Sequence, residues 1–314
     1  MPSYWQLFLL ILPVFALIGV DCVLRRVGWL TAEADSSLLK VVVNFLYPTL
    51  IFDSVLGNAA LQEPGNLLLA PLVGFVTMAG WIGFSFLAGR ALGLTTGHGL
   101  RTFAFAVGIY NYGYIPIPLM TNLFGKESLG VLMVHNVGCE AAIWTVGILV
   151  LSGLSLREGW RKLLNPPVAA LIVAVVVNVM EWTAYVPSVV REVVRLCAAC
   201  AVPLALLLIG ASVWEYFTRP RALVDKRITP YACLLRLCIF PLIFLVAAKY
   251  APFPLELKRV MVVEAAMPAG ILSLVIAKHY GGQPLTAVQV VVGTTVGGLI
   301  VIPLWLKLGL AWVL

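Results

Sequence analysis

Long apolar stretches, separated by short polar segments, follow one another along the whole chain of 314 residues. A helix rises about 1.5 Å per residue, so roughly 20 consecutive apolar residues are needed to cross the ~30 Å hydrocarbon core of a bilayer. The pattern therefore predicts ten membrane-spanning helices. Their expected ranges are 4–24, 38–57, 67–89, 100–123, 128–152, 166–185, 191–213, 230–250, 258–280 and 285–311.

Glycine and proline interrupt two of these apolar stretches. The first interruption is NYGYIPIPLM, beginning at Asn111, and the second is EAAMPAG, beginning at Glu264. Lipid has no water to satisfy freed backbone groups, so a break at membrane depth is tolerated only where it is buried in protein or lines a cavity. Two such breaks in corresponding halves of a chain indicate the substrate site of a transporter.

An internal repeat, shifted by about 155 residues, brings the two breaks into register. Pro48 in NFLYPTLIF matches Pro203 in CAVPLALLL, and Gly125 after the fourth helix matches Gly281 after the ninth. Each half holds five helices, an odd number, so the two halves enter the membrane in opposite senses. We therefore expect an inverted repeat of residues 1–155 and 156–314 within a single membrane-embedded unit.

The residues of the first break predict local unwinding. Pro116 and Pro118 each lack a backbone donor and disfavour helical geometry in the preceding residue, and Gly113 adds conformational freedom. We expect the fourth helix to unwind from Asn111 to Pro118. The second break, with one proline and one glycine, is expected to unwind more briefly.

Two breaks that cross near the midplane would expose amide groups and positive half-helix ends to a shared cavity, which suits an anionic group such as a carboxylate. Asn111 adds an amide that both donates and accepts hydrogen bonds. For either segment alone, a packed proline kink is the alternative. The expected substrate-binding residues are Asn111, Tyr112, Gly113, Tyr114, Pro116, Pro118, Pro268, Ala269 and Gly270.

Three of the acids inside predicted helices are candidates for a role, because an unpaired charge there costs several kcal/mol. Glu264 precedes Pro268 by four residues, about one helical turn, and Glu140 shares a helix face with Asn136. We consider Glu264, Glu140 and Asp53 candidates for coupling transport to H⁺ or Na⁺. A structural pair or a protonated hydrogen bond is the alternative for each.

The composition agrees with a membrane protein and excludes several other classes. Hydrophobic residues make up 61% of the chain and charged residues 11%, far from the balance of a soluble domain. The net charge of +7 is spread among short loops without the clustering of a nucleic-acid-binding face. The six cysteines lie in or beside apolar segments and predict neither a disulfide framework nor a metal site.

Basic residues predict the orientation of the helices. With the amino terminus outside, 14 of the 21 Lys and Arg residues fall on cytoplasmic ends, so the positive-inside rule places both termini on the extracytoplasmic side. These residues are Arg25, Arg26, Lys40, Arg90, Arg101, Arg157, Arg161, Lys162, Arg219, Arg221, Lys226, Arg227, Arg236 and Lys278.

At these motifs the chain resembles the auxin efflux carrier family, which includes the plant PIN proteins and bacterial carriers assigned to malonate or malate. The resemblance rests on NFLYPTLIF, NYGYIPIPL, VPLALLLIG and EAAMPAGILSLVIAKHYGG, and it extends over nearly the whole chain. It implies an all-α integral membrane fold, similar to that of bile-acid sodium symporters, in two inverted five-helix repeats. It also implies that the broken helices 4 and 9 cross at the substrate site, and that a transport domain moves against a scaffold domain in an elevator mechanism.

Asn111 matches the family asparagine at the first crossover, and Pro268 matches the proline at the second. Plant members have a second asparagine where this chain has Tyr112 and Gly113, and they have a long cytoplasmic loop that this chain lacks. Auxin is therefore not the expected substrate. The expected location is a bacterial inner membrane.

The leading hypothesis is a secondary transporter, an efflux carrier of small organic anions, that needs no cofactor beyond a coupling H⁺ or Na⁺. Its expected partners are the anion and the lipid bilayer, and nucleic acid is not expected. A homodimer is one possible oligomeric state. The alternatives are a sodium-coupled symporter of bile-acid-like anions, a membrane receptor without transport, and an intramembrane hydrolase using His135, Glu140 or a buried serine. The chain contains no HExxH, GxSxG or GxxxxGK[ST] motif, so we expect neither hydrolase chemistry nor direct ATP driving.

Overall fold

A computed structural model describes residues 2–152, 165–217 and 223–314, and these parts are helical and contain no β-strand. The predicted repeat boundary at residues 155 and 156 lies outside them. So do five of the basic residues counted for orientation, which are Arg157, Arg161, Lys162, Arg219 and Arg221.

The elements follow the predicted order of helices. They are α1 (Tyr4–Arg26), α2 (Ala32–Val41), α3 (Tyr47–Val55), α4 (Pro64–Ala91), α5 (Leu100–Gly108), α6 (Pro116–Ala142), α7 (Ile148–Ser152), α9 (Pro166–Val179), α10 (Ser188–Phe217), α11 (Ile228–Leu234), α12 (Phe240–Tyr250), α13 (Leu255–Ala265), α14 (Leu272–His279) and α15 (Pro284–Trp312). Single π-helical turns join α2 to α3, α6 to α7 and α11 to α12, at Val42–Leu46, Ile143–Gly147 and Leu235–Ile239.

Six helical stretches in the described residues are long and apolar enough to cross a membrane. They are Tyr4–Arg26, Glu33–Val55, Pro64–Ala91, Pro116–Ser152, Ile228–Tyr250 and Pro284–Trp312. The predicted helices 100–123 and 258–280 are each divided into shorter pieces. The nine residues of α5, for example, rise only about 14 Å and cannot span a bilayer alone.

The first break lies earlier in the chain than predicted, and the second is the briefer of the two, as predicted. The first lies between α5 and α6, at residues 109–115, and helix resumes at Pro116 rather than after Pro118. Pro116 occupies the first helical position, where its missing N–H costs nothing and its fixed φ favours the helix. The second break covers residues 266–271, between α13 and α14.

The chain bends once more inside α6, at Gly125. Its φ of 80° lies in the left-handed region, which glycine enters without a steric cost, so the helix turns between the predicted fourth and fifth spans.

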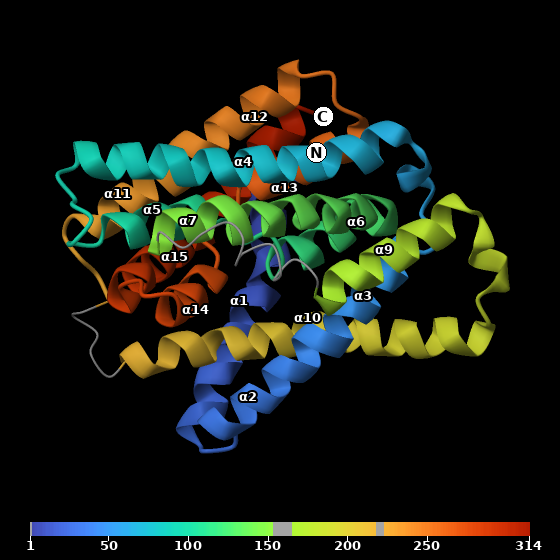
Figure 1. The fold of residues 1–314 in the computed structure, drawn as a ribbon, viewed down its shortest axis with the longest axis horizontal. Coiled ribbons are helices and arrows are strands. Elements are labelled where there is room, and N and C mark those ends of the chain that lie inside the picture. The colour runs from blue at the N-terminus through green and yellow to red at the C-terminus, as the bar shows by residue number, and fades with distance from the viewer. Residues whose placement is uncertain (1, 153–164, 218–222) are drawn as a thin grey trace.

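The helices form two packed groups, which can be followed by colour and label in Figure 1. In one group, α10 packs against α1 and α3, and α9 packs against α3. In the other, α4 packs against α5 and α6, while α13 packs against α6 and α12. Aromatic rings hold the second group together, because Trp81 of α4 stacks on Phe240 of α12 with ring centroids 4.4 Å apart.

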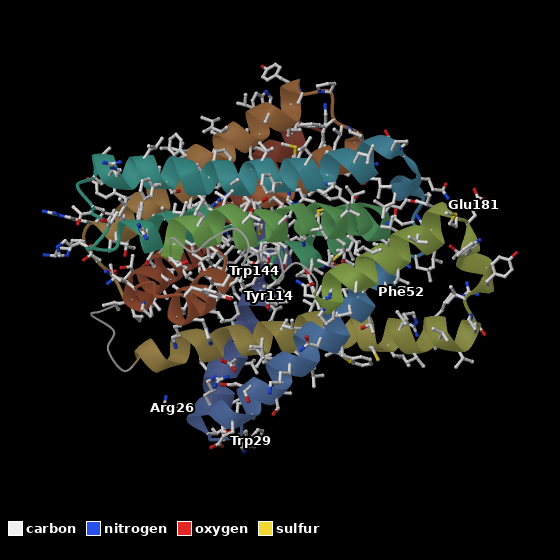
Figure 2. The ribbon with its side chains drawn as sticks, viewed as in Figure 1. Arg26, Trp29, Phe52, Tyr114, Trp144 and Glu181 are labelled. Carbon is white, nitrogen blue, oxygen red and sulfur yellow. The ribbon has the colours of Figure 1, made fainter. Side chains whose placement is uncertain are left out.

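Many large apolar side chains lie on the outer surface, where sticks project from the ribbon in Figure 2. On α4, Leu68 and Leu87 are each 67% exposed, and Val76 is also exposed. A soluble monomer rarely displays such a surface, whereas lipid accommodates it. By contrast, Tyr114 and Trp144 lie near the middle of the molecule in Figure 2.

Candidate functional site

The two broken segments cross each other and are joined by backbone hydrogen bonds. Asn111 donates its N–H to the Pro268 carbonyl at 2.8 Å, and Gly270 donates to the Ile109 carbonyl at 2.8 Å. Tyr110 and Ala269 thereby form a single antiparallel bridge. Each break satisfies backbone groups that the other has freed, which is the condition for unwound chain inside a membrane.

Close approach of the two chains requires a glycine at position 270. A Cβ atom built there would lie 2.8 Å from the Tyr110 carbonyl oxygen and 3.2 Å from a methyl carbon of Ile109. Any larger residue would push the segments apart. We call the two segments together the crossover, with residues 109–115 as its first arm and residues 266–271 as its second arm.

A cavity of about 500 Å³ lies against the crossover, at the boundary between the two helix groups. The first arm, the start of α14, α6 and the turn that follows it contribute one side. The π-helical turn after α2, the start of α3 and the start of α9 contribute the other. The lining residues are Val42, Val43, Asn44, Tyr47, Tyr110, Asn111, Tyr112, Gly113, Tyr114, Glu140, Trp144, Asn165, Pro166, Pro167, Gly270, Ile271 and Leu272.

The predicted site residues divide into two sets in the structure. Six of them line the cavity, and these are Asn111, Tyr112, Gly113, Tyr114, Gly270 and Glu140. The others do not line it: Pro116 and Pro118 have entered α6, Pro268 and Ala269 face inward in the second arm, Glu264 is buried, and Asp53 lies elsewhere.

Asp53 lies away from the cavity at the crossover. Its carboxylate is 3.8 Å from the Lys126 ammonium, and the two residues line a separate apolar cavity between α1, α3, α6 and α10. A charged partner therefore accompanies Asp53, which is the alternative weighed for it from the sequence.

Five polar or aromatic lining residues were missed by sequence reasoning: Asn44, Tyr47, Tyr110, Trp144 and Asn165. A signal existed for Trp144, because it follows Glu140 by one helical turn. Asn44 stood out as an amide within an apolar stretch, but nothing in the sequence linked it to the breaks. Asn165 comes from the start of α9, which only the tertiary fold brings to the cavity.

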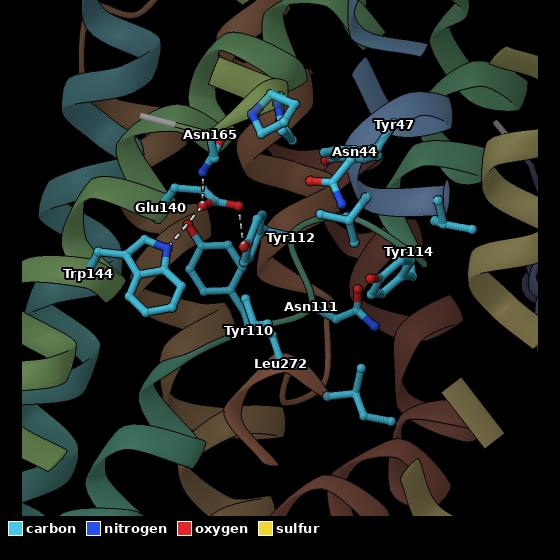
Figure 3. Close-up of a pocket in the computed structure, with 17 residues that line it drawn as sticks. Asn44, Tyr47, Tyr110, Asn111, Tyr112, Tyr114, Glu140, Trp144, Asn165 and Leu272 are labelled. Carbon is cyan, nitrogen blue, oxygen red and sulfur yellow. Dashed lines mark hydrogen bonds between the residues drawn. The ribbon is translucent and has the colours of Figure 1, made fainter. Parts of the chain in front are cut away.

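Glu140 is held by three neutral donors, drawn with dashed lines in Figure 3. The Tyr112 hydroxyl donates to its Oε1 at 3.1 Å, while the Trp144 indole N–H and the Asn165 side-chain amide donate to Oε2 at 3.2 and 3.5 Å. Asn136 fixes the first arm next to this cluster by donating to the Tyr112 carbonyl at 2.8 Å. Aromatic and amide donors thus orient an acid toward the cavity.

Several backbone donors without a partner belong to residues that line the same cavity. Within the described chain, the N–H groups of Tyr112, Gly113 and Tyr114 in the first arm donate no hydrogen bond, nor do those of Ile271 and Leu272. All five residues line the cavity. Leu272 begins α14, whose amino end carries a partial positive charge from the helix dipole. Such groups can bind an anion without a basic side chain.

A buried acidic residue and a buried basic residue lie behind the second arm. Glu264 is completely buried, and neither of its carboxylate oxygens accepts a hydrogen bond from the described residues. Arg236 is equally buried; its Nε donates to the Met267 carbonyl at 3.1 Å, and its guanidinium lies 5.2 Å from the centres of the Tyr110 and Phe240 rings. The charges of Arg236 and Glu264 attract each other at a distance.

Arg236 was predicted to lie at a cytoplasmic helix end, but in the structure it is buried. It lies in the π-helical turn Leu235–Ile239, which turns its side chain into the protein. Aromatic faces and a backbone carbonyl replace water around the guanidinium.

His135 is a further buried group nearby: its ring lies 6.4 Å from that of Tyr110, and its Nε2 has no partner within the described residues.

Known proteins similar to this chain are transporters. A family model described as membrane transport protein matches residues 7–158 and 153–306. An uncharacterized transporter of Methanothermobacter thermautotrophicus is 28% identical over 303 residues, covering 94% of this chain and 96% of that protein. A second uncharacterized transporter, from Methanocaldococcus jannaschii, is 22% identical with the same coverage of both chains. Auxin efflux carrier component 3 of Arabidopsis thaliana is 26% identical over 168 residues, which are 51% of this chain and 26% of that carrier.

Proposed function

Because the chain belongs to the membrane transport protein family, which includes the auxin efflux carriers, we propose that it is a secondary transporter of small organic anions. Membership confirms the resemblance drawn from the sequence. It identifies an integral membrane protein that transports a small molecule, and a transporter rather than an enzyme. Carboxylates are the proposed substrate class, with efflux as the proposed direction.

One observation carries the choice of an anion: five unpaired backbone N–H groups belong to residues lining the cavity at the crossover. Oxygens of a carboxylate accept hydrogen bonds from such donors, and the positive end of α14 adds favourable electrostatics. The Asn111 side chain provides a further amide beside them. The lining residues that the structure describes include no Lys, Arg or His, so backbone groups would carry the recognition.

Alternating access is supported by where the cavity lies. Its walls come from both helix groups, so a displacement of one group against the other would open it to opposite sides in turn. We propose α1, α2, α3, α9 and α10 as the scaffold and the remaining helices as the moving transport unit. The antiparallel crossing of the two arms supports the inverted repeat of residues 1–155 and 156–314.

Coupling to protons or sodium is proposed for Glu264 and Glu140, whose carboxylates have no counter-ion in direct contact among the described residues. Asp53 has Lys126 beside it and supports coupling least. We propose a bacterial inner membrane location with both termini on the extracytoplasmic side.

A flux screen on purified protein in liposomes tests this function. Labelled mono- and dicarboxylates are offered across separate pH and sodium gradients. We expect saturable flux of at least one carboxylate, with the gradient that drives it identifying the coupling ion. A strict sodium requirement would favour the symporter alternative. Absence of saturable flux for every acid, in protein that elutes as a single folded species, would remove the proposal.

A further inference from the structure

We infer that the cavity is built for a zwitterion, an aminocarboxylate whose protonated amine contacts Glu140 while its carboxylate contacts the crossover. The carboxylate end of this inference rests on the proposed function. The amine end rests on separate observations around Glu140.

The first observation is the charge of the cavity. Among the described residues, Glu140 is the one carboxylate in the lining, and none of the lining side chains is basic. Within the described residues its partners are a phenol, an indole and an amide, all neutral, and no ion pair involves it. A carboxylate removed from bulk water is costly unless a positive charge compensates it. A cationic group on the ligand would supply that compensation.

The second observation is that two aromatic residues hold the acid and three more line the same cavity. Tyr112 and Trp144 hold Glu140 directly, and Tyr47, Tyr110 and Tyr114 also line the cavity. The Trp144 ring is itself fixed by an edge contact with Tyr280, at 6.0 Å between centroids. Ammonium groups bind favourably to aromatic faces, most strongly where water is excluded. An acid framed by aromatic rings is therefore a chemically suitable site for an amine.

The third observation is the placement of the two ends. Figure 3 shows Glu140, Trp144 and Asn165 together on one side of the cavity and the Asn111 and Tyr114 side chains on the other. A carboxylate bound at the Asn111 side would be kept away from the negative charge of Glu140. A dicarboxylate, in contrast, would bring its second charge toward Glu140 and be repelled. The same acid would thus favour aminocarboxylates and disfavour dicarboxylates.

Matched ligands separate the two ends. Binding to the purified full-length protein is measured by calorimetry for leucine, 4-methylpentanoate and 3-methylbutylamine, which share one branched skeleton. The linear pair 5-aminopentanoate and pentanoate tests a longer spacing between the charged groups. We expect at least one aminocarboxylate to bind tenfold or more tightly than its amine-free counterpart, a difference of about 1.4 kcal/mol.

Substitution of Glu140 provides the decisive comparison. Glu140→Gln should weaken binding of the preferred aminocarboxylate at least tenfold and tighten binding of the amine-free acid, because the repelling charge is gone. Glu140→Asp, which keeps the charge but shortens the side chain, should give an intermediate ratio, and Trp144→Phe should lower the amine preference several-fold. Glu127→Gln, an exposed acid on the same helix, is the matched control and should leave the ratio unchanged.

The outcomes distinguish this inference from the function on which it rests. Equal binding of both aminocarboxylates and their amine-free counterparts would overturn the zwitterion while leaving an anion carrier in place. A preference that survives in both Glu140→Gln and Trp144→Phe would also overturn it. If no carboxylate-bearing probe binds at all, the proposed function fails together with the inference.

Discussion

The two arms of the crossover hold corresponding positions in the repeat but differ in what surrounds them. Asn111, Tyr112 and Tyr114 of the first arm present side chains to the cavity. Met267 and Ala269 of the second arm are almost completely buried, and Arg236 and Thr294 hold their backbone groups. Two breaks in the same repeat register can thus have different tasks: the first arm presents most of the recognising groups, whereas the second arm is mainly a buried backing that adds one backbone donor, at Ile271.

The largest expected effect concerns the charges behind the second arm. Arg236→Met should destabilise the protein by roughly 3 kcal/mol, because it leaves the buried Glu264 carboxylate without a compensating charge. The double variant Arg236→Met with Glu264→Gln should recover part of that loss, since both charges are then absent. Thermal unfolding in detergent is measured for each single variant and for the double variant. Strictly additive effects of the two substitutions would mean that the charges do not support each other.

A glycine in each arm allows a direct comparison of packing. Gly270→Ala should cost about 1–3 kcal/mol, because the new methyl group would meet the Tyr110 carbonyl at 2.8 Å. Gly113→Ala should cost much less, because its methyl group would meet only the Tyr47 hydroxyl, at 3.6 Å. Unfolding temperatures of the two variants decide the matter. Equal losses would contradict a tight second arm.

A smaller effect is expected where α15 supports the second arm. The Thr294 hydroxyl accepts a hydrogen bond from the Ala269 N–H at 3.1 Å, so Thr294→Val would leave that donor unpaired and cost about 1–2 kcal/mol. The neighbouring Thr295→Val is the matched control and should be close to neutral. Hydrogen exchange at Ala269 should also rise in the first variant alone, and unchanged protection there would argue against this support.

The smallest effect concerns the start of α11, the helix that leads to Arg236. Asp225 accepts hydrogen bonds from the N–H groups of Ile228 and Arg227, and these bonds hold the pKa of its carboxyl below the usual value. The ionised form therefore stabilises the fold above the unfolded-state pKa of about 3.9, and this contribution is lost as the pH falls through the lower folded-state pKa.

Because Asp225 is partly exposed to solvent, the contribution is less than about 1 kcal/mol. It should appear as a small decrease in unfolding temperature on acidification toward the folded-state pKa. Asp225→Ala should reduce that decrease, and an identical acid profile in the variant would show that this cap contributes nothing.

Sequence reasoning located the arms because glycine and proline act through the local backbone. Gly113 and Pro268 disfavour helical geometry whatever surrounds them, whereas the need for glycine at position 270 comes from its contact with the Tyr110 carbonyl. The extent of the breaks was harder to predict, because proline also starts helices, and Pro116 does so here.

The remainder of the site depends on contacts between distant parts of the chain. Asn165 reaches Glu140 only because α9 begins beside α6, and no local sequence pattern indicates this contact. Arg236 resembled an ordinary charge at a helix end, yet a π-helical turn directs it to the Met267 carbonyl. Side chains whose role is set by tertiary packing were therefore the ones that the sequence did not reveal.

If the first arm recognises the substrate, removal of the Asn111 side chain should abolish transport, and flux through Asn111→Ala measures this. Uptake of a transported carboxylate into liposomes is measured for the wild-type protein, for Asn111→Ala and for Asn122→Ala, an exposed control in α6. We predict saturable flux in the wild type and the control, and a loss of flux in Asn111→Ala although that variant still folds. Its unfolding temperature should fall only slightly, because the variant loses the hydrogen bond that the Ile115 N–H donates to the Asn111 side chain. Wild-type flux in a folded Asn111→Ala variant would contradict the claim.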